Sequence, residues 1–247
     1  MNRRIPAAVT IGVREFRRTP VLLVLLLVLP TYFVGTFVLL VPETAILLTV
    51  GETTTTVSMS AFAAAFMTAV AVAILSGIVG LFLALSSRAA DDRLRLAGYS
   101  SVELVVARIG TLAAGAAVVS VVAVSVAVQI FEPADLWAFT ALTGLLGITY
   151  GVVGVIVGLL FDRLAGVYVM LLVPLVDVLL FQNPLASEIP DWTVYLPGHY
   201  ATAALFETAF TDSVGLETIL GAIGYATALV ALSVVAFHYT TAVESNR

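Results

Sequence analysis

Asp177 is an acidic residue that lies well inside a long apolar stretch of the sequence. It comes 12 residues after Ala165, which is about 18 Å along a helix. In a helix that crosses a membrane, it would lie toward the outer half of the bilayer. A charge there costs about 2.5–3.5 kcal/mol unless it is protonated, hydrated or paired. Two interpretations stay open: Asp177 lines a substrate path or ties two helices together, or it faces water near the outer mouth.

A second group of polar residues lies between two apolar stretches, at 88–99, with the sequence RAADDRLRLAGY. The pair Asp91 and Asp92 could suggest metal-phosphate chemistry, but arginines surround it and no further carboxylate follows at a fitting interval. A solvated, salt-bridged helix face is the better interpretation. A short helix over 89–97 would end at Gly98, and a capping box of Ser100 and Glu103 would start the next helix. A polar helix with both signs of charge suits docking onto another protein. The candidate docking residues are Arg88, Asp91, Asp92, Arg93, Arg95 and Tyr99.

The other residue types exclude several kinds of chemistry. We place His199 outside the membrane and His238 near the inner end of the last apolar stretch, so they cannot share a zinc ion. The sequence has no cysteine, and all of its basic residues are arginine. It therefore has no thiolate ligand, no cysteine nucleophile and no phosphate-binding lysine. Because no glycine-rich phosphate loop, G-x-S-x-G elbow or H-E-x-x-H pair is present either, we predict no catalytic residue, no metal site and no cofactor bound by this chain.

The composition predicts that these residues sit in a membrane protein. Of 247 residues, 61% are hydrophobic and only 11% are charged, and the mean hydropathy is +1.11. Soluble domains are about half apolar and a quarter charged. Apolar segments of about 20 residues cross the bilayer as helices, because each must pair its own backbone groups. We therefore predict an all-α polytopic membrane protein of one domain. Its six spans are expected at 20–41, 59–85, 103–130, 136–160, 164–182 and 216–239.

The segment 1–19 before the first span is predicted to be an amphipathic helix in the membrane plane. Ile5, Val9, Val13 and Phe16 recur at helical spacing, while five arginines occupy the rest of its surface. Such a helix lies in the headgroup layer with its arginines toward anionic lipid. A disordered basic tail is the alternative.

The arginines also predict the orientation of the chain. With six spans, every arginine falls on one side, and the loops on the other side carry acidic residues and no arginine. The positive-inside rule makes the arginine side cytoplasmic. Trp137 and Trp192 then fall at the outer boundary, where tryptophan is enriched. We expect a multi-pass protein of the plasma membrane with both termini in the cytoplasm.

Two further segments bear on packing. Five glycines follow one another at intervals of three and four residues in the fourth span: Gly144, Gly147, Gly151, Gly154 and Gly158. This stripe lets another helix approach closely, either within the chain or in a dimer. Pro30 and Pro174 are expected to kink the first and fifth spans. The external segment 183–215 holds an apolar stretch at 201–210 that is too short to cross, so we predict a helix that is interfacial or re-entrant.

The order of these elements resembles the permease subunit of ABC-2 type transporters, a class of ATP-binding-cassette membrane domains. The resemblance covers essentially the whole chain. Its most telling pieces are RAADDRLRLAGYSSVELVVARI at 88–109, FDRLAGVYVMLLVPLVDVLLFQNP at 161–184 and LPGHYATAALFETAFT at 196–211. One departure is the short inner loop at Asp162 and Arg163, which leaves little room for a second coupling element.

This resemblance implies a transport subunit that is not itself an enzyme. The segment 1–19 would be the connecting elbow, and 88–99 would be the coupling helix in a groove of a separate ATPase subunit. ATP and magnesium would bind to that partner. Two permease chains, identical or sister subunits, would join two ATPase chains in the bilayer and export a substrate. No nucleic acid is implied.

Two other classes stay open. A polytopic membrane enzyme, such as a lipid-modifying one, should show several polar residues clustered at one membrane depth, and in the sequence only Asp177 qualifies. A non-catalytic membrane scaffold is the other alternative.

Overall fold

The computed structural model describes residues 20–51, 53–96, 101–186 and 190–244. Side chains at 20–23, 25–27, 87–96, 101–107 and 237–244 lie outside this description, as does the predicted amphipathic helix at 1–19. The described chain is mostly helical, as the sequence predicts, with one small sheet. Its elements are α2 (Pro20–Leu40), β1 (Ala45–Val50), β2 (Thr53–Ser58), α3 (Met59–Leu96), α4 (Ser101–Ala127), α5 (Leu136–Leu160), α6 (Arg163–Pro174), a π-helix (Leu175–Phe181), a 3-10 helix (Asp191–Tyr195), α7 (His199–Phe210) and α8 (Leu216–Glu244).

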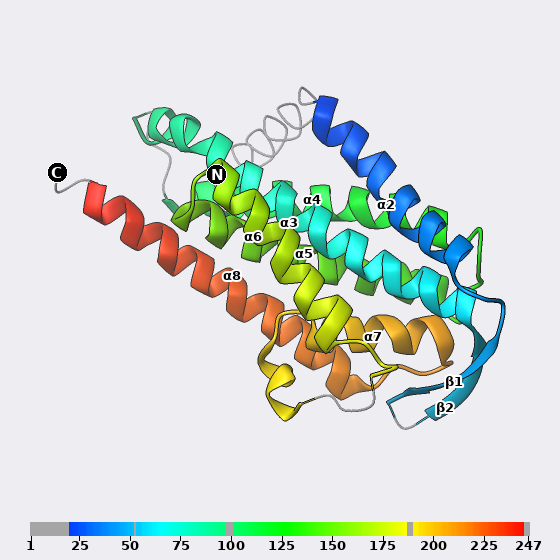
Figure 1. Ribbon diagram of the computed structural model, residues 1–247. Coiled ribbons are helices and arrows are strands. Elements are labelled where there is room, and N and C mark those ends of the chain that lie inside the picture. Colours follow the sequence, from blue (N-terminus) through cyan, green and yellow to red (C-terminus); the bar gives the residue numbers. More distant parts are fainter. Residues whose placement is uncertain (1–19, 52, 97–100, 187–189, 245–247) are drawn as a thin grey trace.

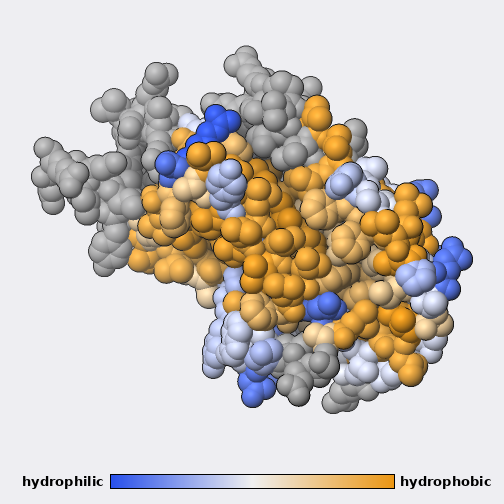
Figure 2. Space-filling model, in the orientation of Figure 1, coloured by the Kyte–Doolittle hydropathy of each residue, from blue (hydrophilic) through white to orange (hydrophobic). Residues whose placement is uncertain are grey.

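Five helical stretches among the described residues are long and apolar enough to cross a membrane. They are Met59–Ser86, Arg108–Ala127, Leu136–Leu160, Arg163–Phe181 and Leu216–Ala236. Each coincides with a predicted span. The remaining predicted span, 20–41, corresponds to α2, of which Val28–Leu40 is described as a shorter apolar helix. The apolar helices support the predicted membrane location, and Figure 2 shows apolar residues over most of one face, with polar residues gathered at its ends.

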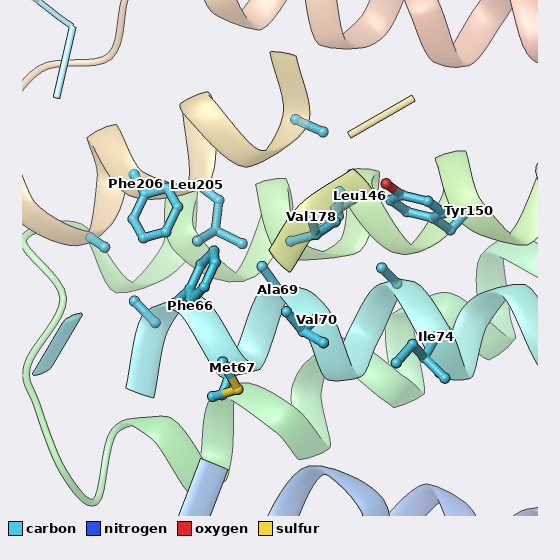
Figure 3. Packing of buried hydrophobic residues seen from close by; sticks show 14 of the residues in the cluster. Phe66, Met67, Ala69, Val70, Ile74, Leu146, Tyr150, Val178, Leu205 and Phe206 are labelled. Atoms are coloured by element: carbon cyan, nitrogen blue, oxygen red, sulfur yellow. The ribbon is translucent and has the colours of Figure 1, made fainter. Parts of the chain in front are cut away.

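α3 is the central helix of this bundle. It packs against α2, α4, α5 and α6 (Figure 1), and between Phe62 and Ala84 most of its side chains are buried. A helix that is apolar on all sides belongs in the interior. Figure 3 shows Phe66 and Ala69 of α3 close to Leu205 and Phe206 of α7, and the Phe66 and Phe206 rings lie 6.0 Å apart.

The glycine stripe of α5 packs within the chain. A Cβ atom on Gly154 would collide with the backbone oxygen of Gly77 on α3, and one on Gly80 would collide with the backbone oxygen of Gly151. Gly147 faces the Ser76 hydroxyl, where a Cβ would come within 2.9 Å. Small residues therefore bring the two backbones into direct contact. Of the two interpretations of the stripe, packing within the chain applies to these glycines. Gly144 is less tightly packed, because a Cβ there would meet only the Ser120 hydroxyl, at 3.9 Å.

The small sheet is one feature of the fold that we did not predict. β1 and β2 pair antiparallel from Ala45 opposite Ser58 to Val50 opposite Thr53. Gly51 turns the chain with a φ of 58°, a left-handed conformation that glycine adopts without steric cost. Leu48 and Val50 are buried, while the residues between and around them are more exposed. The threonine run of β2 is β-branched, which favours strand over helix.

α3 also differs from its predicted end. It continues without interruption to Leu96, so the helix expected at 89–97 is, over its described residues, the last part of α3 rather than a separate helix. The expected break at Gly98 lies outside the described residues. Figure 1 shows this end of α3 at one end of the molecule, while the hairpin and α7 lie at the other.

Candidate functional site

Asp177 lies in the π-helix Leu175–Phe181, directly after α6, and only 3% of its surface is exposed. Pro174 precedes the π-helix and has no N–H group to continue the regular ladder of α6. A local change of helical register at such a point is expected, and π-helical turns are frequent at functional sites. At the proline where we predicted a kink, the helix thus changes register, and Asp177 on the following turn is buried.

Three donors surround the Asp177 carboxylate. The Tyr150 hydroxyl donates to Oδ2 at 2.5 Å, and the backbone N–H of Gly198 donates to the same oxygen at 2.9 Å. The Gln182 amide donates from Nε2 to Oδ1 at 3.1 Å. Hydrogen bonds to an ionised acceptor are among the strongest in proteins. Asp177 therefore connects α5, its own π-helix and the start of α7, which agrees with the interpretation that it ties helices together. Because Asp177 is buried, the interpretation that it faces water does not fit.

His199 extends this network toward the surface. Its Nδ1 lies 3.1 Å from Gln182 Oε1. Because a carboxylate only accepts, the Gln182 NH2 group must face Asp177, which leaves Oε1 toward the imidazole. Nδ1 must then carry the proton. Burial lowers the pKa of His199 below its ordinary value of 6.5, and the negative charge of Asp177 partly opposes this shift, so the neutral imidazole is favoured.

The charge of Asp177 is balanced by dipoles. Gly198 is the residue before α7, so the carboxylate lies at a helix N-terminus, where free N–H groups and the helix dipole favour an anion. Among the described residues, Arg108 and Arg163 begin apolar spans at the other end of the bundle. Arg163 lies 5.0 Å above the Phe82 ring. The three hydrogen bonds described around Asp177 all come from uncharged donors.

Glu207 is a second buried acid, on α7, with 8% of its surface exposed. The backbone N–H of Gly215 donates to its Oε2 at 2.7 Å, and the Thr218 hydroxyl donates to Oε1 at 3.1 Å. Gly215 directly precedes α8, so Glu207 also occupies a helix N-terminus. Glu207 falls within the predicted helix at 201–210, and the structure shows that it is buried there.

α7 is the non-spanning helix that the sequence predicted within 183–215. It packs against α3, α5 and α8, and eight of its 12 residues are buried. At its C-terminal end, the backbone N–H groups of Ala134 and Asp135 donate to the carbonyl oxygens of Ala209 and Thr208, both at 3.1 Å. These carbonyls have no partner within the helix. Backbone groups at both ends of α7 are therefore hydrogen-bonded to other parts of the protein.

The predicted docking residues are only partly described. The backbone at Arg88, Asp91, Asp92, Arg93 and Arg95 is helical, while their side chains, and all of Tyr99, lie outside the described residues. Asp177 contacts the start of α7, which lies at the other end of the molecule from the last part of α3 (Figure 1), and so does not join them. Sequence reasoning missed Tyr150, Gln182 and Gly198 as partners of Asp177, and His199 as a partner of Gln182. Tyr150 and Gly198 lie 27 and 21 residues from Asp177, so no local spacing could have indicated them.

This arrangement is suited to holding helices in place rather than to binding a metal. No group of three His, Cys, Asp or Glu side chains that could hold a metal occurs in the described part of the chain. The Asp177 oxygens are occupied by donors, while Nε2 of the half-buried His199 has no hydrogen-bond partner among the described residues. In comparisons with known proteins, no family model, no curated protein and no solved structure matches the chain.

Proposed function

We propose that the chain is the membrane-spanning permease subunit of an ABC-2 type transporter and works with a separate ATP-hydrolysing subunit. The observation that carries the proposal is the length of α3. Its 38 residues extend about 57 Å, whereas the hydrocarbon of a bilayer is about 30 Å thick. The most buried helix of the bundle thus continues into a segment with charges of both signs. A force applied to that segment acts directly on the core.

In this proposal, the partner subunit binds ATP and magnesium and docks on the segment 88–99 through Arg88, Asp91, Asp92, Arg93, Arg95 and Tyr99. Closure of the paired ATPase subunits pushes on the end of α3. The sequence contains no phosphate-binding loop, which supports assigning ATP hydrolysis to a separate subunit. Two permease chains complete the transporter, and export is the direction that the resemblance implies. Asp177 lies on the path or positions the helices that form it.

The first experiment is to purify the chain from native membranes and identify copurifying proteins. An ATP-binding-cassette ATPase is expected. Its absence under mild detergent, together with ATP-independent function of the purified chain, would contradict the proposal.

A charge-neutralised variant tests the docking segment. Asp91→Asn, Asp92→Asn, Arg93→Gln and Arg95→Gln together should abolish ATPase association and transport while membrane insertion is unchanged. The matched control neutralises four exposed acids predicted on the opposite side, which are Glu43, Glu132, Asp191 and Asp212. This control should retain association. Equal association in both variants would place the docking surface elsewhere.

A membrane enzyme is the second candidate, and one observation favours it. Such an enzyme needs polar residues gathered at one depth, and the network of Tyr150, Asp177, Gln182 and His199 satisfies this condition. His199 would then be the acid–base group. The test is turnover of a lipid mixture by the purified chain without any ATPase, and loss of that turnover in His199→Asn. Copurification of an ATPase and ATP-dependent transport would instead favour the permease.

A further inference from the structure

α7 lies against the outer part of α5 and is attached to it at both ends. Its start is joined to Tyr150 through the Asp177 carboxylate, and its last turn is joined to Ala134 and Asp135, just before α5 begins. From Asp135 to Tyr150 is 15 residues, about 22 Å of helix, and the 12 residues of α7 span about 18 Å. The two attachment points on α5 thus match the length of α7.

α5 is held in turn by α3 through direct backbone contact. Gly151 and Gly154 lie within about one turn of Tyr150 on α5, and they meet the backbone of α3 at Gly80 and Gly77. No side chain lies between the two helices there to absorb a displacement. Close-packed contacts of this kind transmit strain instead of deforming.

One oxygen atom connects α5 to the start of α7. Asp177 Oδ2 accepts from both the Tyr150 hydroxyl and the Gly198 N–H. Tyr150 is fully buried, and its ring lies in the main apolar cluster with residues of α3 and α7 (Figure 3). Its position is therefore fixed by the core, and its hydroxyl determines where the carboxylate is held.

We propose that Tyr150 is a positioning residue which, through Asp177, passes a displacement at the α3–α5 contact to α7 at the outer end of the protein. The inference deepens the proposed function by naming the route from the pushed helix to the outer end. It rests on that function only in assigning the push to the ATPase. The attachment is a property of the single chain and can be tested without a partner.

The test is a double-mutant cycle measured by hydrogen exchange on the full chain in lipid nanodiscs. Gly154→Ala displaces α3 from α5 at a point one turn from Tyr150. It should speed exchange of the α7 amides about tenfold, within the range of couplings between contacting residues. In a Tyr150→Phe background, the same substitution should change α7 exchange by less than about twofold, while its effect on α3 and α5 remains.

Two control variants distinguish a displacement passed to α7 through Tyr150 from a general loosening of the whole helix bundle. Gly144→Ala makes the same change on α5 where space is open, and it should leave α7 exchange unchanged. Tyr225→Phe removes a hydroxyl that donates to the Tyr195 backbone oxygen, and its effect should simply add to that of Gly154→Ala. If Gly154→Ala does not fold, Gly158→Ala takes its place, since its Cβ would press on Ala84 at 2.8 Å.

Additive effects of Gly154→Ala and Tyr150→Phe on α7 would overturn the inference. This outcome is distinguishable from failure of the proposed function, because hydrogen exchange needs neither ATP nor a partner. A chain without an associated ATPase could still show the coupling, and a true permease could lack it.

Discussion

Replacement of Asp177 by asparagine or by leucine should have very different consequences. Both substitutions remove the same buried charge, so the cost of burying that charge cancels between them. They differ in the acceptors that remain for Tyr150, Gly198 and Gln182, the three donors around the carboxylate. The comparison therefore measures the hydrogen bonds rather than the charge.

The asparagine side chain in Asp177→Asn can satisfy all three groups. Its oxygen takes the place of Oδ2 and accepts from Tyr150 and Gly198, so its NH2 group faces Gln182. The Gln182 amide then turns over, which presents Oε1 to the new asparagine and Nε2 to His199. Nδ1 of His199 must accept, and the imidazole proton moves to Nε2. Leucine offers no acceptor, so three buried donors stay unsatisfied at about 1–3 kcal/mol each, and Asp177→Leu should be less stable than Asp177→Asn by at least about 3 kcal/mol.

Reversible unfolding in mixed detergent micelles measures this difference. Nitrogen-15 NMR of histidine side chains reports the tautomer, and the His199 signals are identified by their loss in His199→Asn. We expect the Nδ1–H form in the native chain and the Nε2–H form in Asp177→Asn. Equal stability of the two variants, or an unchanged tautomer, would show that the network is not arranged as we describe.

Three further predictions concern single contacts and use the same unfolding assay. Tyr150→Phe removes a hydrogen bond to a carboxylate and should cost about 1.5–3 kcal/mol, whereas Tyr225→Phe removes one to a neutral carbonyl and should cost about 0.5–1.5 kcal/mol; equal costs would contradict the assignment. Gly154→Ala should destabilise by about 1–3 kcal/mol through overpacking, while Gly144→Ala should stabilise by up to about 1 kcal/mol; stabilisation by both would refute the close contact with α3. Because the pKa of His199 is lowered in the folded chain, that chain binds fewer protons than the unfolded chain just below pH 6.5. The stability due to neutral His199 is therefore complete above pH 6.5 and is lost as the pH falls through the lowered pKa. His199→Asn should remove this pH dependence of the unfolding free energy, and an unchanged pH profile would contradict the prediction.

Local features of the sequence were sufficient to predict most of the helices. The fourth span was expected at 136–160 and is Leu136–Leu160, because the length of an apolar run depends only on neighbouring residues. The glycine stripe likewise indicated a close helix contact, although its partner, α3, could not be named. The end of α3 was misjudged because the second span was expected to end at residue 85, before a separate helix at 89–97. In the structure, the Ser86 hydroxyl lies 3.4 Å from the Leu83 carbonyl oxygen, and the helix continues past it.

The partners of Asp177 could not be predicted in this way. Its donors come from a different span and from the irregular segment before α7, and only tertiary packing brings them together. The hairpin was missed for another reason. The run from Thr53 to Val57 carries a strand signal, but it lies in the connection between the first two predicted spans, where we predicted no element.

The two buried acids have a common explanation in the helix starts that they contact. At the start of α7, the buried N–H of Gly198 would lose its acceptor without Asp177. α8 begins beside it, and Glu207 meets the same need. Each acid lies at the positive end of a helix dipole, so each charge is accounted for by backbone geometry. It follows that a buried carboxylate in this chain is weak support for catalysis by itself, and that Asp177 and Glu207 hold α7 to its neighbours.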